Sequence, residues 1–428
     1  MARTTGISVH KAWDILFDKH KILDRIASHG SYKISSKEIN AVKEARLMAK
    51  FDQSVQLPIV FQKNKLSILP ITRGEYLIGP FQTHEKIRYS DVKPVPVEIP
   101  DLQTLDYTNL YSEAAALLFA YNSGVIQDIM GSDKIAFTVN GRMSSGSFNY
   151  YIDDSVKAGT RINISIQNSQ VEIDAGYESP EAFCICEAKN IAAEELLIRQ
   201  LFYPYRLWKS KIEKPIIPVL LVFSNDVFHV FQYEFTDPNY YNSIQLNQHK
   251  AYTFADEEIT LTEVIHLWKS VTPKPEPPIT FPQADSFERI IDLLSVLYEK
   301  GLTRDEVTLK YEFDPRQTNY YISACEYLDL IERGTNVDGE REYRLSAEAQ
   351  IIMGMRYKLK HMALIKKVLE RPVFHKVFGI SIQSGSIPEK NEICKVMADS
   401  NLNINHVTIN RRSSTVRSWM DWILRIAE

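Results

Sequence analysis

The chain has 428 residues and a formal net charge of −4, with 44% hydrophobic and 24% charged residues. This length is too great for one ordinary hydrophobic core and predicts two to four domains. The sequence lacks the run of about eighteen apolar residues that a membrane-spanning helix needs, and its first residues lack the apolar segment of a signal peptide. We therefore expect a cytoplasmic protein without membrane contacts.

Two proline-rich stretches interrupt the sequence, at residues 93–100 and 272–282. Such stretches favour extended backbone and are typical of linkers between domains. They predict an N-terminal segment over residues 1–95, a middle segment over 100–270, and a C-terminal segment that begins at residue 283.

The N-terminal segment opens with the pattern of an amphipathic helix at Val9–His29. Three short apolar runs follow it, at Leu57–Phe61, Leu66–Ile71 and Tyr76–Phe81, and turn-forming residues separate them. These runs predict strands. The segment is therefore expected to be a small α+β module, and none of its residues indicates a reaction.

The middle segment alternates helical and strand patterns, which predicts an α/β fold. Helical spacing of apolar residues covers Leu105–Met130, and a second helix is expected at Ala192–Phe202. The expected strands are Ile135–Val139, Phe148–Ile152, Ile162–Ile166, Val171–Asp174, Phe183–Lys189, Ile216–Phe223 and Val227–Tyr233.

One of these apolar strands ends in charged residues, Glu187 and Lys189. Residues two apart in a strand project to the same face, and the preceding strand would bring Asp174 to the same edge. Phosphodiester hydrolysis uses such a set, because carboxylates bind Mg²⁺ and a lysine stabilises charge on the phosphate or orients the attacking water. The alternative is a surface Glu–Lys pair at a strand end.

Other carboxylates compete for the role of Asp174. Glu172 lies two residues earlier on the same strand face, and Asp153 and Asp154 lie farther from the lysine strand. The pattern alone leaves these alternatives open.

Asp174 together with Glu187-Ala188-Lys189 resembles the signature of the PD-(D/E)XK nucleases. The resemblance implies an α/β nuclease core with a mixed sheet flanked by helices, and Mg²⁺ as the cofactor. Asp174 and Glu187 would be the metal ligands and, with Lys189, the catalytic residues. Ile173 stands where the family often has proline.

The same resemblance implies two further catalytic residues. Gln200 lies on the expected helix after the lysine strand, where the family often carries a glutamine and a tyrosine. The spacing to Tyr203 and Tyr205 departs from the usual one, so their roles stay open. Glu113, on the first predicted core helix, is the candidate for the family's helix carboxylate, and a solvent-exposed glutamate is the alternative.

A Gly/Ser-rich segment at residues 140–150 resembles a motif of restriction enzymes. Glycine lets backbone approach a phosphate closely, and Arg142 supplies positive charge. Arg142, Ser144 and Ser145 are therefore expected to contact DNA, whereas an ordinary polar turn is the alternative.

The first C-terminal unit, residues 283–350, resembles the winged-helix domains attached to restriction enzymes. Asp314 and Pro315 can begin a helix, and a hairpin wing is expected at Val337–Leu345. Near the start of this helix stand side chains of types that contact bases or phosphates, namely Arg316, Gln317, Asn319 and Tyr320. A winged helix used only for protein contacts is the alternative.

The second C-terminal unit, residues 351–428, is basic, since 13 Lys and Arg face 6 Asp and Glu from Arg356 onwards. It resembles a second winged-helix element. Basic and hydroxyl side chains are expected at the start of its last helix, where an anion would bind. These candidate DNA contacts are Arg411, Arg412, Thr415 and Arg417.

Together the resemblances imply a type II restriction endonuclease that cuts double-stranded DNA and has a cognate DNA methyltransferase as its functional partner. The N-terminal module would contact DNA or support the core. A nuclease that requires methylated DNA, a repair nuclease, and a non-catalytic winged-helix regulator remain alternatives. Monomer and homodimer both stay open.

Overall fold

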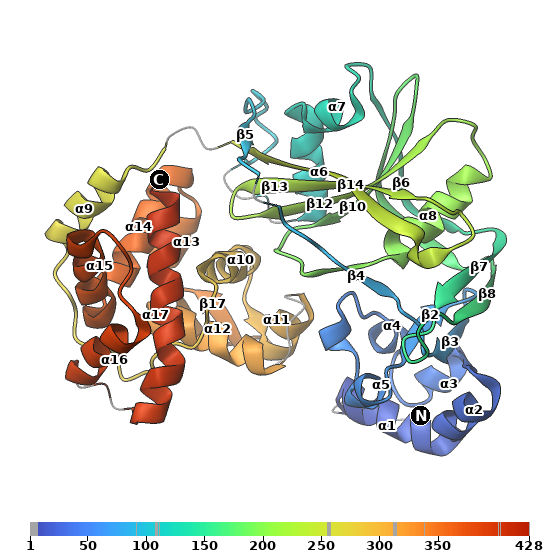
Figure 1. Cartoon of the computed structure of the whole chain (residues 1–428), viewed down its shortest axis with the longest axis horizontal. Helices are drawn as coiled ribbons and strands as arrows, with labels where there is room; N and C mark the ends of the chain where they lie inside the picture. Colours follow the sequence, from blue (N-terminus) through green and yellow to red (C-terminus); the bar gives the residue numbers. More distant parts are fainter. Residues whose placement is uncertain are drawn as a thin grey trace.

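The computed structural model describes residues 7–427, except residues 91, 108, 109, 111, 255–257, 311–314, 338, 401 and 403. Figure 1 shows an N-terminal module, a central sheet with its covering helices, and a mostly helical C-terminal region. The mixed α/β class is confirmed. In the described part of the chain, no helix has the length and apolar character needed to cross a bilayer.

The N-terminal module combines short helices with a three-stranded antiparallel sheet of order β1-β3-β2. The predicted first helix is two helices, because Lys21 adopts a left-handed conformation with φ 49° between them. The predicted strand at Leu57–Phe61 is wrong, since a helix begins at Ile59 and buries Phe61 against Trp13. The elements are α1 (Val9–His20), α2 (Ile22–His29), β1 (Tyr32–Ser35), α3 (Ser36–Asn40), α4 (Ala45–Met48), α5 (Ile59–Lys63), β2 (Ser67–Pro70) and β3 (Glu75–Gly79).

The central sheet has seven strands in the order β5-β14-β13-β12-β10-β9-β6. It is mixed, because β10 runs parallel to β12 and antiparallel to β9. Its strands are β5 (Val95–Pro96), β6 (Ala136–Ser144), β9 (Gln170–Glu178), β10 (Phe183–Lys189), β12 (Ile216–Ser224), β13 (Val227–Phe235) and β14 (Ile244–Thr253). The first proline-rich stretch thus contributes an edge strand, and sequence patterns missed β14.

Alternate residues of the central strands enter two hydrophobic cores on opposite faces of the sheet. In β10, Cys184 and Cys186 pack with α6 (Glu113–Asn122) and α7 (Val125–Met130). Ile185 packs on the other face with α8 (Arg199–Lys209) and with the separate hairpin β7 (Ser147–Asp153) and β8 (Arg161–Gln167). This alternation explains why every residue of β10 is buried, and it sends Glu187 and Lys189 towards α8.

Both helices predicted for the middle segment begin later than expected. The first starts only at Glu113, where the Ser112 side chain caps it, and Gly124 with φ 84° separates α6 from α7. The second starts at Arg199 because β11 (Glu195–Leu197) precedes it and pairs with β4 (His84–Lys86). This pairing joins the central domain to the chain that leaves the N-terminal module.

The C-terminal region has one continuous hydrophobic core. It contains a small antiparallel sheet of order β15-β17-β16. Helix α9 (Leu261–Ser270) also joins this core, although it lies before the predicted boundary at residue 270. The other elements are α10 (Phe287–Leu297), β15 (Leu302–Thr303), α11 (Arg304–Lys310), α12 (Pro315–Tyr327), β16 (Ile331–Thr335), β17 (Arg341–Leu345), α13 (Ala347–Met353), α14 (Tyr357–Leu369), α15 (Pro372–Ser384), α16 (Lys390–Asp399) and α17 (His406–Ile426).

The expectation of a second winged-helix-like unit is wrong in one respect. After β17 the described residues form helices and no strand, so this unit has no sheet and no wing. Helices α13 to α17 share their core with α10 and α12 instead of forming a separate domain.

Buried polar contacts join the C-terminal region to the central sheet. Asp292 on α10 accepts hydrogen bonds from the backbone N–H of Ala192 (3.0 Å) and from the hydroxyl of Ser224 (2.9 Å). Lys360 on α14 lies 2.7 Å from a carboxylate oxygen of Asp226, which occupies the turn between β12 and β13. The two parts of the chain are therefore docked through specific contacts.

Burial of Asp292 predicts a pH dependence of stability. Burial raises the pKa of Asp292 to about 7, against the opposing effect of the Ala192 N–H. The folded protein therefore retains a proton that the unfolded chain releases above its ordinary pKa, so this group lowers stability as the pH rises from about 4 to about 7. The wild type should lose about 1–3 kcal/mol of unfolding free energy through this group between pH 5 and pH 8, and Asp292→Asn should not. The fall in melting temperature over this range should therefore be a few degrees smaller in Asp292→Asn. Thermal denaturation measures both proteins. An equal fall in melting temperature in the wild type and in Asp292→Asn would show that Asp292 is not the source of the pH dependence.

Candidate functional site

Asp174, Glu187 and Lys189 lie together at one end of the β9–β10 strand pair. The ammonium of Lys189 donates to the Glu187 carboxylate over 3.1 Å. The Asp174 carboxylate accepts a hydrogen bond of 2.9 Å from the backbone N–H of Ala188, between the other two residues. Glu187 and Lys189 are each 7% exposed. The alternative of a solvent-exposed Glu–Lys pair is therefore wrong.

Burial makes ionisation of this carboxylate group unfavourable. It raises the pKa of Glu187 to about 8, although Lys189 opposes the shift and the neighbouring carboxylates add to it. Burial also raises the pKa of Asp174 and of Glu113, with Lys189 opposing in both cases. Several acids are thus held close to one ammonium group, which is a typical arrangement of functional sites.

Gln200 reaches this group from the first turn of α8. Its side-chain N–H donates to the same Glu187 oxygen that Lys189 contacts. Its side-chain oxygen is buried and has no hydrogen-bond partner. The hydroxyl of Tyr203 has other partners, since it lies 3.1 Å from the hydroxyl of Tyr150 and donates to the carbonyl of Pro70. Tyr205 packs against Phe235.

A carboxylate that sequence patterns missed comes from the N-terminal module. Asp52 is 8% exposed and lies 3.7 Å from the Lys189 ammonium. Burial alone would raise its pKa, but Lys189 and then Lys50 and Arg199 outweigh this effect, so the pKa of Asp52 is lowered. Lys189 therefore lies between the carboxylates of Glu187 and Asp52.

The segment that carries Asp52 is fixed to the central domain. The Gln53 side chain donates to the Glu195 carbonyl over 2.9 Å, and the Ser54 N–H donates to the Glu195 carboxylate over 2.8 Å. Glu195 begins β11, the strand that pairs with β4. No local pattern marks Asp52 in the sequence, because this placement depends on contacts between residues far apart in the chain.

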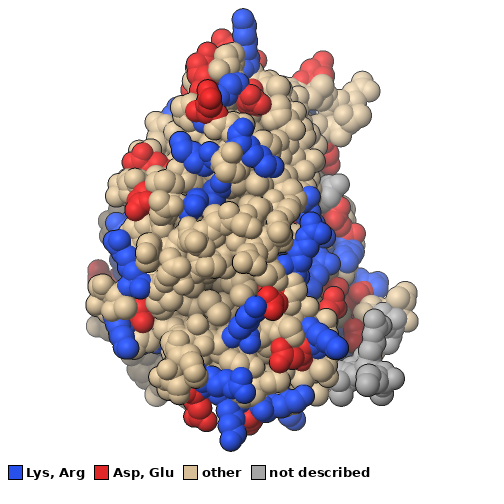
Figure 2. All heavy atoms as spheres, turned by 90° about the vertical axis from the view of Figure 1, so that its right-hand side faces the viewer, with Lys and Arg blue, Asp and Glu red and all other residues tan. Residues whose placement is uncertain are grey.

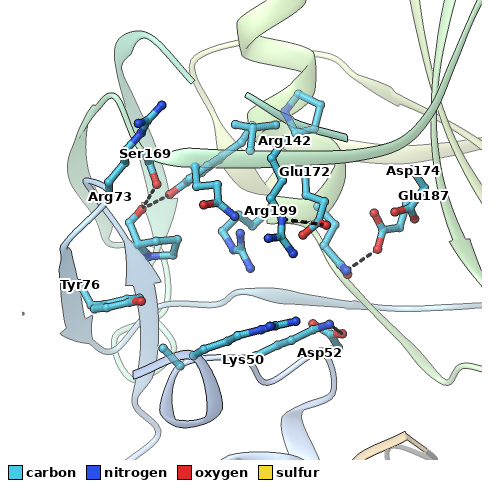
Figure 3. A pocket seen from close by; sticks show the side chains of 18 of the residues that line it. Lys50, Asp52, Arg73, Tyr76, Arg142, Ser169, Glu172, Asp174, Glu187 and Arg199 are labelled. Carbon is cyan, nitrogen blue, oxygen red and sulfur yellow. Dashed lines mark hydrogen bonds and ion pairs between the residues drawn. The ribbon is translucent and has the colours of Figure 1, made fainter. Parts of the chain in front are cut away.

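The side chains of Asp52, Asp174, Glu187, Lys189 and Gln200 border one pocket of about 460 Å³ between the N-terminal module and the central sheet. Its acidic end carries Asp52, Glu113, Asp174 and Glu187, with Lys189 and Gln200 among them. The rest of its lining is rich in cations, which are Arg46, Lys50, Arg73, Arg142 and Arg199. Figure 3 shows Lys50 and Asp52 on one side of the pocket and Asp174 and Glu187 across from them.

The Gly/Ser-rich segment is mostly strand. Arg142 lies on β6 and pairs with Glu172 over 3.1 Å at the pocket, so Glu172 is engaged away from Lys189. Ser144 ends β6, and its hydroxyl donates to Asn168. Ser145 is only 2% exposed, so the expectation that its side chain contacts DNA is wrong.

The candidate recognition residues of α12 lie on an exposed surface. Arg316, Gln317, Asn319 and Tyr320 are all exposed near the start of this helix, and none of them borders the pocket. Asp314, the expected cap, lies outside the described residues.

The candidate contacts in the last helix are not at its start. Helix α17 begins at His406, where Asn405 caps it, so the basic cluster lies in the helix interior. Thr415 is fully buried and donates to Asp285 over 2.7 Å, and Arg412 is 8% exposed. The expected anion site at a helix start is therefore wrong. Arg411 and Arg417 remain exposed on the helix surface.

The donor set of the acidic end suits Mg²⁺. The described residues include no ready-made group of three or more His, Cys, Asp or Glu side chains around a metal position. Mg²⁺ does not require one, because it usually takes one or two carboxylates and completes its shell with water and substrate phosphate. The buried, unpartnered oxygen of Gln200 beside Glu187 also fits a site that a hydrated ligand completes.

The chain is similar to three family models, each described as a domain of unknown function. The model DUF6996 matches residues 10–78, DUF6997 matches 79–253, and DUF7226 matches 289–428. No curated protein and no solved structure matches the chain. The three matches follow one another along the chain and carry no activity with them, so the function is inferred from the site.

Proposed function

We propose that this protein is a Mg²⁺-dependent endonuclease of the PD-(D/E)XK type that cuts double-stranded DNA, as a type II restriction enzyme does. The observation that carries this proposal is the convergence of Asp174, Glu187 and Lys189 from two paired strands at the acidic end of a cation-lined pocket. A hydrolytic site for phosphodiesters needs carboxylates for a hard cation beside a fixed positive charge.

Each residue of the site has a separate role in this proposal. Asp174 and Glu187 would hold Mg²⁺, which when bound lowers the pKa of a coordinated water and offsets charge on the phosphate. Lys189, fixed between Glu187 and Asp52, places its ammonium where negative charge develops on the phosphate. Gln200 orients the Glu187 carboxylate, and Glu113 adds a further carboxylate at the pocket edge.

The fold around the site supports the proposal. A mixed sheet with α6 on one face and α8 on the other presents the two acidic strands next to each other. In the C-terminal region, the order α10, β15, α11, α12, β16, β17 with a β15-β17-β16 sheet resembles that of a winged-helix domain, which supports the proposal. We assign DNA recognition to the exposed start of α12 in that unit.

The proposal is tested by incubating the purified chain with several unmethylated phage and plasmid DNAs, with Mg²⁺ or with EDTA. Discrete fragments that form only with Mg²⁺ are the expected result. Fragments from methylated DNA alone would instead identify a modification-dependent nuclease. Binding of DNA with no cleavage of any substrate would overturn the proposal and favour a regulator.

A further inference from the structure

The basic residues of the pocket come from two separate parts of the chain. Arg46, Lys50 and Arg73 belong to the N-terminal module, whereas Arg142 and Arg199 belong to the central domain. Within the described residues, Arg46, Arg73 and Arg199 make no ion pair, whereas Lys50 lies 3.8 Å from Asp52 and Arg142 pairs with Glu172. Arg46, Lys50 and Arg73 are exposed to solvent. Cations gathered around one pocket repel one another, and a bound polyanion would relieve that repulsion.

The charges of the pocket are ordered. The carboxylates of Asp52, Asp174 and Glu187 gather around Lys189, where Lys50 also lies 3.8 Å from Asp52. Four arginines, Glu113 and Glu172 make up the rest of the charged lining. Figure 2 views the molecule from the right-hand side of Figure 1. On that face, Lys and Arg side chains lie around a largely uncharged hollow. A phosphodiester chain needs such an order, with acids at the bond that is cut and cations at the flanking phosphates.

Several contacts fix the position of the N-terminal wall of the pocket relative to the acidic end. Asp52 contacts Lys189, Gln53 and Ser54 bind Glu195, and β4 pairs with β11. Since Lys50 precedes Asp52 by two residues and lies 3.8 Å from its carboxylate, this cation is held close to Lys189.

From this arrangement we infer that the N-terminal module is the second wall of the nuclease cleft, and that Arg46, Lys50 and Arg73 bind the phosphate backbone of the DNA strand next to the cut. The inference rests on the proposed function, and it gives the module a substrate-binding role. The strand passes between the N-terminal module and the start of β9, with its flanking phosphates at the cations.

The test measures DNA affinity without cleavage. Fluorescence anisotropy in EDTA gives the dissociation constant of a labelled duplex at several salt concentrations, for the wild type and for the double variant Arg46→Ala/Arg73→Ala. Each phosphate contact contributes about 0.9 to the slope of log affinity against log salt. Loss of two contacts should lower that slope by about 1 to 2 and weaken binding about tenfold at moderate salt.

The matched control is Lys37→Ala/Lys63→Ala, which removes two exposed cations of the same module outside the pocket. It should retain the wild-type slope. A double variant of Arg46 and Arg73 that keeps the wild-type slope, while the wild type binds, would overturn the inference and leave the proposed function standing. Absence of duplex binding by the wild type would overturn both. Melting temperatures should not change, because all four substituted side chains are exposed.

Discussion

Lys189→Met should abolish most DNA cleavage while leaving DNA binding intact. Methionine keeps the apolar stem of the side chain in its buried position and removes only the ammonium. Lys189 is the cation that contacts both Glu187 and Asp52 at the acidic end. Loss of one fixed electrostatic stabiliser of a transition state typically lowers the rate by about 100- to 1,000-fold. The single-turnover rate on a cleaved plasmid measures this effect.

The control for this prediction is Lys214→Met. Lys214 also forms an ion pair with a β9 carboxylate, Glu178, over 2.6 Å, but it lies outside the pocket and is partly exposed. The control should cleave at the wild-type rate. Equal activity of Lys189→Met and the wild type would remove Lys189 from the reaction.

Lys360→Ala should destabilise the protein by about 3–5 kcal/mol, because it leaves the carboxylate of Asp226 buried without its partner. The two side chains are 5% and 6% exposed, and the ammonium lies 2.7 Å and 2.9 Å from the two carboxylate oxygens. This pair joins α14 to the turn between β12 and β13, so its loss weakens the docking of the C-terminal region. Thermal denaturation measures the change.

A double variant separates the loss of charge balance from the loss of packing. Asp226→Asn with Lys360→Ala removes both charges at the same loss of side-chain volume at position 360, and asparagine tolerates the left-handed conformation of position 226, where φ is 62°. Replacing a buried ion pair by neutral groups is often nearly neutral in stability. The double variant should therefore regain most of the stability that Lys360→Ala loses. A double variant as unstable as the single one would show that the charges are not the cause.

Sequence patterns located the central strands well where burial is continuous. The run from Phe183 to Lys189 has the predicted bounds, because an apolar strand buried on both faces leaves a clear signal. The turn at Asn225 and Asp226 lies between the two predicted strands Ile216–Phe223 and Val227–Tyr233, and both of its residues have the positive φ that their residue types tolerate. The gathering of Glu187 and Lys189 follows directly from strand periodicity.

The remaining features depend on contacts that no local pattern encodes. Asp52 reaches the site only because Gln53 and Ser54 bind Glu195, which lies far away in the chain. The burial of Thr415 depends on Asp285, from the segment that leads into α10. Helix α17 begins at His406 because the Asn405 side chain caps it, so the arginines that are expected at the helix start lie in its interior.

The most direct test of the site compares Asp174→Asn with Glu172→Gln in the Mg²⁺-dependent cleavage assay. The two residues lie two apart on β9, but Asp174 lies at the acidic end, whereas Glu172 is engaged with Arg142. Loss of cleavage by about 100-fold or more in Asp174→Asn, with activity within a few-fold of wild type in Glu172→Gln, is the predicted result. An active Asp174→Asn protein would contradict the assignment of the metal-binding carboxylates and with it the nuclease site.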